Sequence, residues 1–170
     1  APLTFISMPR ERGPNLGDVL RDRQQLSVSW VVAFNKLAQS CLIDLLHAVQ
    51  YLHTTLRVLH LDIKPPNLVL SSQYTNEMQQ RDVVLPTLVL VDHGLTKSAD
   101  KNHTRVGGTH NYHPEANWQK SEDCGGANTE MDMYAVGATV YEMVSGSFPH
   151  IGDAIKFEDG KATGRWAHPQ

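Results

Sequence analysis

The sequence predicts an α+β fold that is mainly helical. Apolar residues recur with a period of about 3.6 residues through 29–53, as in a long helix with one buried face. A second apolar segment, 129–145, also has helical length, and two short apolar runs, 68–70 and 88–91, have the length of β-strands. The 170 residues are enough for one compact domain with a hydrophobic core.

The first part of the chain alternates short elements with turns. Leu3–Met8 predicts a strand, and Pro9–Asn15, which holds two prolines and a glycine, predicts a turn or linker. Leu16–Arg23 predicts a short helix. Ser27 or Ser29 can cap the long helix that follows, because serine accepts a hydrogen bond from the first turn.

The middle of the chain is predicted to hold a hairpin between two polar loops. Arg57–Asn67 is a polar loop in which Pro65-Pro66 opposes an α-helix. The polar loop Ser71–Pro86 joins the two predicted strands and is expected to form a hairpin-like excursion. Ser98–Ser121 is polar, irregular and rich in histidine.

The predicted second helix is apolar on most sides, so we expect it to be buried. Gly146 follows it directly and is expected to end it. From Ile151 onward the pattern is weak, and no clear final element is predicted.

Composition excludes several classes of partner. The formal net charge is −3 and the basic residues are scattered, which predicts no nucleic-acid partner. No apolar run reaches transmembrane length, so no membrane partner is predicted. Cys41 and Cys124 do not form a disulfide pattern, which favours a reducing, intracellular location in the cytoplasm or nucleus.

The strongest motif is His60-Leu61-Asp62-Ile63-Lys64-Pro65-Pro66-Asn67. An aspartate here can orient or accept a hydroxyl proton, and a lysine two residues later can reach a transferring phosphate. An asparagine three residues after the lysine can turn back to hold a metal ion. The spacing of Asp62, Lys64 and Asn67 therefore predicts phosphoryl-transfer chemistry.

Three further motifs follow in order. Asp92-His93-Gly94 comes directly after a predicted strand, where a carboxylate can bind Mg²⁺ and the glycine allows a sharp turn. Gly108-Thr109 precedes Tyr112-His113-Pro114-Glu115, and Asp132–Gly137 runs into Tyr141–Gly146. In order and spacing these segments resemble the eukaryotic-type protein kinase family, in particular its large C-terminal lobe. The resemblance covers roughly residues 3–150.

The resemblance implies a division of the chain. Residues 1–15 would be the last strand of the small lobe and the hinge, and 16–170 a partial C-terminal lobe. Within that lobe, 60–67 would be the catalytic loop, 92–115 the activation segment and 129–145 the central helix. The glycine-rich loop, strand lysine and glutamate helix of the family are not in this sequence, so we expect the small N-terminal lobe to be absent.

The resemblance also assigns the reacting groups. Asp62 would be the catalytic base, and Lys64 would neutralise the transferring phosphate and favour a Ser/Thr acceptor. Thr109 would place the acceptor hydroxyl, and Asn67 and Asp92 would hold Mg²⁺.

The nucleotide, ATP, would bind between hinge and hairpin. Met8 would be the gatekeeper, Pro9 to Glu11 would meet the adenine edge, Asn15 would reach the ribose, and Val69 would form the floor beneath adenine. Asp132 would hold the catalytic-loop backbone from below.

Three departures from the family pattern qualify these roles. Leu61 stands where many members have arginine, so we expect activity that does not depend on phosphorylation of the activation segment. His93 replaces a phenylalanine but can still pack against His60, and the Tyr112–Glu115 motif is one residue short. His-Leu-Asp and Tyr-His-Pro resemble divergent herpesvirus kinases, which would imply a host cell nucleus.

The leading hypothesis is an ATP- and Mg²⁺-dependent Ser/Thr protein kinase with protein substrates. A lone large lobe would expose an apolar cleft face around Val69 and Leu70. We therefore expect this chain to be inactive alone and to need the missing small lobe or a regulatory protein. Two alternatives stay open: a pseudokinase scaffold or allosteric module, and a small-molecule phosphotransferase.

Overall fold

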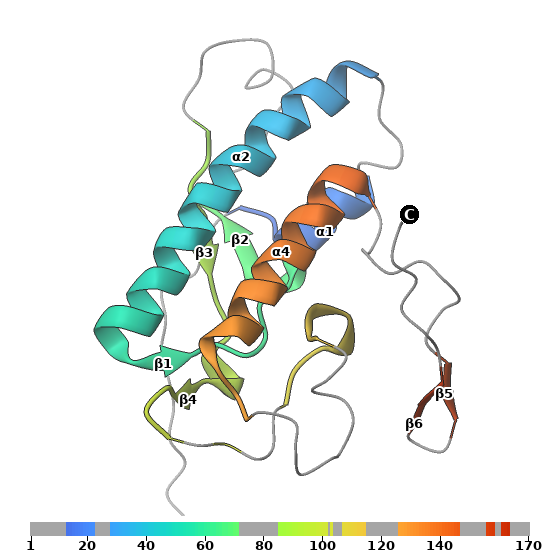
Figure 1. Ribbon diagram of the computed structural model, residues 1–170. Coiled ribbons are helices and arrows are strands. Elements are labelled where there is room, and N and C mark those ends of the chain that lie inside the picture. The colour runs from blue at the N-terminus through green and yellow to red at the C-terminus, as the bar shows by residue number, and fades with distance from the viewer. Residues whose placement is uncertain are drawn as a thin grey trace, which may run out of the picture.

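The computed structural model describes residues 13–22, 28–71, 85–101, 103, 107–114, 126–146, 156–158 and 161–163. The predicted strand Leu3–Met8 and the hinge residues up to position 12 lie outside them. Three helices, α1 (Leu16–Asp22), α2 (Val28–Tyr51) and α4 (Thr129–Ser145), surround a small hairpin (Figure 1). The predicted α+β, mainly helical character is confirmed in these ranges.

Helix α2 begins one residue before the predicted start. Ser29 therefore lies inside the helix, and Ser27, the other predicted cap, lies outside the described residues. After Tyr51 the chain continues as one wider π-helical turn, Leu52–Leu56. Arg57 ends this turn in the left-handed conformation with φ 55°, and its N–H bonds to the Leu52 carbonyl. The turn redirects the chain toward the polar loop that follows.

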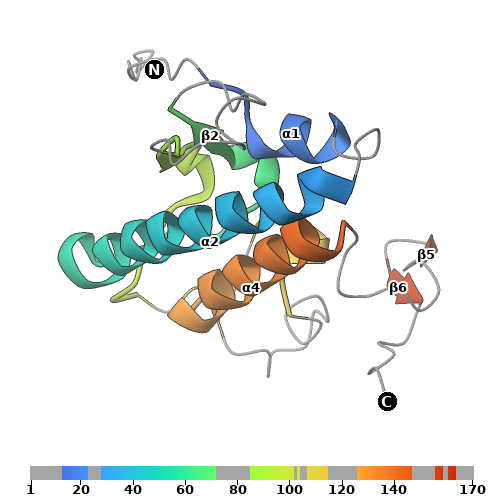
Figure 2. The same cartoon turned by 90° about the horizontal axis from the view of Figure 1, so that it is seen from above.

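Helices α2 and α4 run side by side (Figure 1), and the view of Figure 2 has α1 and β2 on the side of α2 that lies away from α4. The apolar stripe that predicted α2 is the face that packs here. Its side chains are almost fully buried at Leu37, Ala38, Cys41, Leu45 and Val49. They join Ala135, Val136 and Met143 of α4 in one core cluster. Burial raises the pKa of the Cys41 thiol to about 12, so this thiol stays protonated.

The predicted hairpin is present. Strand β2 (Leu68–Leu70) pairs antiparallel with β3 (Leu88–Leu90), with Leu68 opposite Leu90. Residues alternate between the faces of a strand, so Leu68 and Leu70 are both fully buried while Val69 is half-buried. The expected exposed apolar face around Val69 and Leu70 is therefore wrong at Leu70, which faces the core.

Two pairs of very short strands were not predicted. β1 (Val58–Leu59) pairs with β4 (Lys97–Ser98), so part of the predicted polar loop is strand. β5 (Lys156–Glu158) pairs with β6 (Lys161–Thr163), which corrects the expectation that the tail has no clear element. Strands of two or three residues are too short for a period to be visible in the sequence.

Helix α4 has the predicted bounds. Asn128 caps it by accepting a hydrogen bond from the Met131 N–H at 3.1 Å, and Gly146 ends it with φ 77°. The expectation that most of its sides are buried is wrong. Met133, Tyr141 and Val144 are each about half exposed, because only one face of α4 meets α2. No helix in the described ranges combines the length and the apolarity that a membrane crossing requires.

The packing of α2 gives a matched stability test. Leu45 is 2% exposed, and its neighbour Leu46 is 37% exposed on the same helix. Leu45→Ala should lower the free energy of unfolding by about 2–5 kcal/mol, because it leaves a cavity in the core. Leu46→Ala removes the same atoms from a partly solvated site and should lower it by less than about 1 kcal/mol. Urea denaturation measures both, and equal losses would contradict this packing.

Candidate active site

Four of the predicted site residues meet around the carboxylate of Asp62. Its Oδ2 lies 2.8 Å from Lys64 Nζ and accepts a hydrogen bond from Asn67 Nδ2 at 3.0 Å. Its Oδ1 accepts from Thr109 Oγ1 at 2.9 Å. Lys64 Nζ also donates to Thr109 Oγ1 at 2.8 Å, which closes a ring of polar contacts. Thr109 thus lies within hydrogen-bond distance of Asp62, and its role in placing an acceptor hydroxyl stays a prediction.

Opposing effects act on the Asp62 carboxyl. Burial favours its protonated form and would raise its pKa. The hydrogen bonds from Lys64, Thr109 and Asn67, with the positive charge of Lys64, act the other way and prevail. The pKa of Asp62 therefore lies below its ordinary value, and the group is a carboxylate at neutral pH.

The loop that carries Asp62 is held by the fully buried carboxylate of Asp132 in α4. Asp132 accepts hydrogen bonds from the backbone N–H groups of His60 and Leu61, both at 2.8 Å. These two N–H groups converge because Leu61 adopts a left-handed backbone, with φ 67°. The predicted role of Asp132 as the anchor of the loop backbone is confirmed.

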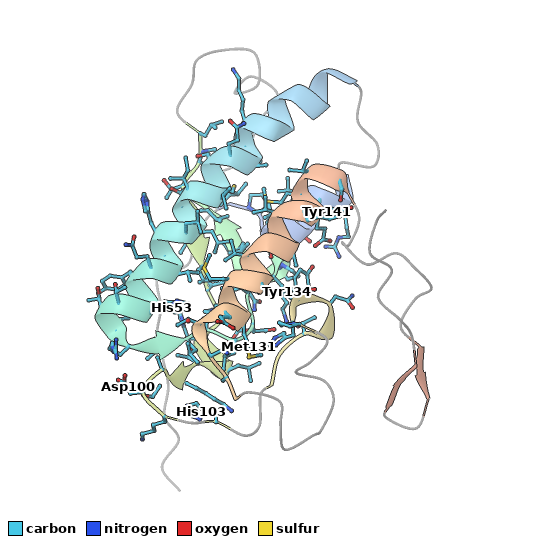
Figure 3. The ribbon with its side chains drawn as sticks, viewed as in Figure 1. His53, Asp100, His103, Met131, Tyr134 and Tyr141 are labelled. Atoms are coloured by element: carbon cyan, nitrogen blue, oxygen red, sulfur yellow. The ribbon has the colours of Figure 1, made fainter. Side chains whose placement is uncertain are left out.

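A third donor to Asp132 was not predicted. His53, in the π-helical turn after α2, lies with its Nε2 2.8 Å from the Asp132 carboxylate. Figure 3 shows His53 at this end of α2 and labels Met131, the neighbour of Asp132 in the first turn of α4. His53 belongs to none of the four motifs, and its partner is distant in the sequence, so no sequence signal pointed to it.

His60 is buried between the loop and β3 and is neutral. Its Nδ1 accepts the Asp62 N–H at 3.3 Å, so the proton is on Nε2, which donates to the Val91 carbonyl at 3.2 Å. The His93 ring meets it edge-on, with centroids 5.1 Å apart, as predicted. Burial first, and the nearby His93 second, lower the pKa of His60 below its ordinary value.

Asp92 follows β3 in a left-handed conformation with φ 64°, and its carboxylate is exposed. Its Oδ1 accepts the Gly94 N–H at 3.3 Å. The backbone links this turn to the loop, because the Val91 N–H donates to the Asn67 carbonyl at 2.9 Å. The amide nitrogen of Asn67 is used by Asp62, which leaves its side-chain oxygen as a ligand atom. An amide oxygen and a carboxylate fit the oxygen preference of Mg²⁺.

The predicted nucleotide residues are only partly described. Met8, Pro9 and Glu11 lie outside the described residues. Asn15 lies beside Val69 through an isolated β-bridge. The Asn15 side chain caps α1: its Oδ1 accepts the Asp18 N–H at 2.9 Å, and its Nδ2 donates to the Asp18 carboxylate at 2.8 Å. A contact with ribose would have to replace these bonds, so that role stays a prediction.

Tyr112, in the predicted activation segment, is linked to α4 by a bond that was not predicted. Its buried hydroxyl donates to Glu142 Oε2 at 2.6 Å. Burial, and next the Glu142 carboxylate, raise the pKa of Tyr112, and burial likewise raises the pKa of Glu142. The pair joins the end of the segment to the last turns of the helix.

The histidines of this region do not form a metal centre in the part of the chain that the structure describes. His103 Nε2 lies 2.8 Å from the Ser98 carbonyl, and His113 Nε2 lies 3.1 Å from the Leu61 carbonyl. Since a carbonyl can only accept, both ring nitrogens carry a proton and are not free to bind a metal.

Comparison with known proteins assigns the class. The family model described as protein kinase domain matches residues 7–163, and the chain belongs to the protein kinase family. It is 24% identical over 154 residues to a probable serine/threonine-protein kinase PknB of Bifidobacterium longum, covering 89% of this chain and 19% of that protein.

Two further relatives come from animals. Human death-associated protein kinase 2 is 27% identical over 143 residues, which is 83% of this chain and 33% of that protein. Serine/threonine-protein kinase par-4 of Caenorhabditis briggsae is 34% identical over 113 residues, 63% of this chain and 15% of that protein. The chain thus spans a third or less of the length of these relatives.

The anchor provided by Asp132 can be tested by stability. Asp132→Asn replaces one acceptor oxygen by a donor, so a buried N–H of the loop loses its partner. We expect the free energy of unfolding to fall by about 3 kcal/mol. Asp100→Asn is the control, because Asp100 pairs with Arg57 on the surface. This substitution should lower the free energy of unfolding by less than about 1 kcal/mol. Similar losses in both variants would argue against the anchor.

His60 predicts how stability depends on pH. Its pKa is lowered in the folded protein from the ordinary value of 6.5, so the unfolded chain takes up this proton first as pH falls. The stabilising contribution is complete above 6.5 and is lost as pH falls from there toward the folded pKa. Unfolding measured from about pH 7.5 to 5.5 should have a flatter slope for His60→Gln. A slope as steep in His60→Gln as in the wild-type protein would contradict this assignment.

Proposed function

We propose that the protein containing this chain transfers a phosphoryl group from ATP, with Mg²⁺, to serine or threonine of protein substrates. The observation that carries the proposal is the Asp62 carboxylate, held within 3.0 Å of Lys64, Asn67 and Thr109. A base, a cation and a potential metal ligand thereby share one small site. The family and the names of the relatives support the same reaction class.

In this proposal Asp62 accepts the proton of the substrate hydroxyl. Its lowered pKa keeps it ionised at neutral pH, so it is available as an acceptor. Lys64 lies beside it and would neutralise charge on the transferring phosphate. Thr109 would position the acceptor hydroxyl, because its own hydroxyl already bonds to the Asp62 carboxylate.

The residues available for the nucleotide and metal fit their chemistry. Asn67 and Asp92 would hold Mg²⁺, which when bound bridges phosphate oxygens and neutralises their charge. Val69 is half-buried, as a residue beneath adenine would be in the absence of the nucleotide. Met8, Pro9 and Glu11 would complete the adenine site, and Asn15 would face the ribose.

The surroundings of Leu61 support activity without phosphorylation of the activation segment. Leu61 is 2% exposed and packs with Leu59 and Met131 in an apolar cluster. A phosphate group would find no cation at this position of the loop, since leucine stands there. We therefore propose that another contact orders the segment.

We further propose that 16–170 is a partial C-terminal lobe that needs its small lobe or a regulatory protein, in an intracellular location. The pseudokinase alternative rests on His93, Leu61 and the short Tyr112–Glu115 motif. The small-molecule phosphotransferase alternative is weaker, because Lys64 and Thr109 suit a polypeptide acceptor. The resemblance to herpesvirus kinases stays a prediction.

The metal role of Asp92 gives the decisive test. In the full-length protein, Asp92→Ala should abolish nucleotide-dependent phosphotransfer, because one of the two proposed Mg²⁺ ligands is lost. Asp62→Asn should lower kcat by about 10²–10⁴-fold, the usual contribution of a general base. Transfer of labelled phosphate to a protein substrate measures both.

Asp100→Asn is the matched control, since this exposed aspartate lies outside the site and should leave turnover unchanged. Unchanged activity in Asp92→Ala would refute the metal role. Nucleotide binding by a wild-type protein that transfers no phosphate would favour the pseudokinase alternative.

A further inference from the structure

His113 is a buried polar residue for which the proposed function provides no role. It is 5% exposed and lies in the short motif that departs from the family pattern. Its Nε2 donates to the backbone carbonyl of Leu61 at 3.1 Å. The bond joins two segments that are 52 residues apart in the sequence, the activation segment and the catalytic loop.

Leu61 is held from three directions at once. Its N–H donates to Asp132 of α4, and its carbonyl accepts from His113. Its side chain is buried against Leu59 and Met131. With both backbone groups bonded and φ at 67°, Leu61 has a backbone conformation that its surroundings must maintain.

Gly108 lies close to the His113 ring and the Leu61 carbonyl. Its φ is 132°, a conformation that residues with a side chain rarely adopt. A Cβ at this position would collide with the His113 ring and would lie 2.5 Å from the Leu61 carbonyl oxygen. The two segments therefore approach so closely that glycine is required where they cross.

This crossing lies next to the proposed chemistry. Thr109 directly follows Gly108, and Asp62 directly follows Leu61. The hydrogen bond from Thr109 Oγ1 to Asp62 Oδ1 is thus one residue away from the His113 bond on the catalytic loop and four residues away on the activation segment. Loss of the His113 hydrogen bond would therefore first weaken the contact between Thr109 and Asp62.

We propose that His113 is a positioning residue that clamps the activation segment onto the catalytic loop through the Leu61 carbonyl. The clamp holds Thr109 at Asp62 without a phosphate group on the segment. Its effect on turnover rests on the proposed function, while its effect on the segment does not. A histidine that merely fills space would need no proton on Nε2, which distinguishes the two roles.

Two substitutions in the full-length protein separate these roles. His113→Leu keeps the apolar volume but removes the donor, whereas His113→Gln keeps an N–H donor at a similar reach. We expect His113→Leu to lower kcat at least about tenfold with KM for ATP nearly unchanged, because a small misplacement of reacting groups is costly. His113→Gln should recover most of this loss.

Hydrogen exchange provides a readout that needs no activity. The Tyr112 amide donates to the Thr109 carbonyl at 3.0 Å and reports on the order of the segment. In His113→Leu its exchange should accelerate at least about tenfold relative to amides in the middle of α2. Uniform acceleration that includes α2 would indicate a loss of global stability only and would overturn the proposal.

His103 offers a matched control in the same region. Its Nε2 also donates to a backbone carbonyl at 2.8 Å, but this carbonyl belongs to Ser98, outside the 60–67 loop. Figure 3 shows that His103 and Asp100 lie at one edge of the molecule. His103→Leu should leave kcat and the exchange of the Tyr112 amide unchanged.

The outcomes are distinct. Loss in His113→Leu, recovery in His113→Gln and no effect in His103→Leu would support the clamp. Equal damage in both His113 variants, or no change in the Tyr112 amide of His113→Leu, would overturn it. If the wild-type protein transfers no phosphate, the proposed function fails, and the exchange measurements alone still decide for or against the clamp.

Discussion

The structure depends on one buried carboxylate, that of Asp132. A charge removed from water is costly unless donors surround it, and here two backbone N–H groups of the 60–67 loop and the ring of His53 do so. The same bonds fix the position of the loop relative to α4 and hold Leu61 in a left-handed conformation. Since Asp62 is the next residue, the direction of its carboxylate follows from this anchor.

In the site, the protonation states of Asp62 and His60 depend on the balance between burial and nearby charges. Burial disfavours the ionised form of Asp62, but three donors and the charge of Lys64 more than compensate for it. The neighbouring His60 is neutral instead, because burial first and the nearby His93 second lower its pKa. An anionic acceptor next to a neutral histidine suits the removal of a proton from a hydroxyl. Membership of the protein kinase family agrees with this chemistry.

The departures from the family pattern lie close together in space. Leu61 stands in place of an arginine and is buried, and its carbonyl accepts a hydrogen bond from His113, a residue of the shortened motif. Gly108 allows the two segments to come this close. In our interpretation, the bond from His113 to the Leu61 carbonyl orders the predicted activation segment. It would take the place of a bond between a phosphate group on that segment and an arginine at the position of Leu61.

The sequence by itself determined the local parts of this protein. The bounds of α4, the hairpin strands and the grouping of Asp62, Lys64 and Asn67 were predictable, because periodicity and short spacing act over a few residues. Only the tertiary structure decided that His53 meets Asp132, that His113 meets Leu61, that Leu70 faces the core and that one side of α4 is exposed. Each of these contacts joins residues that are far apart in the chain. They form only when whole helices and strands pack together, and local sequence patterns do not encode that packing.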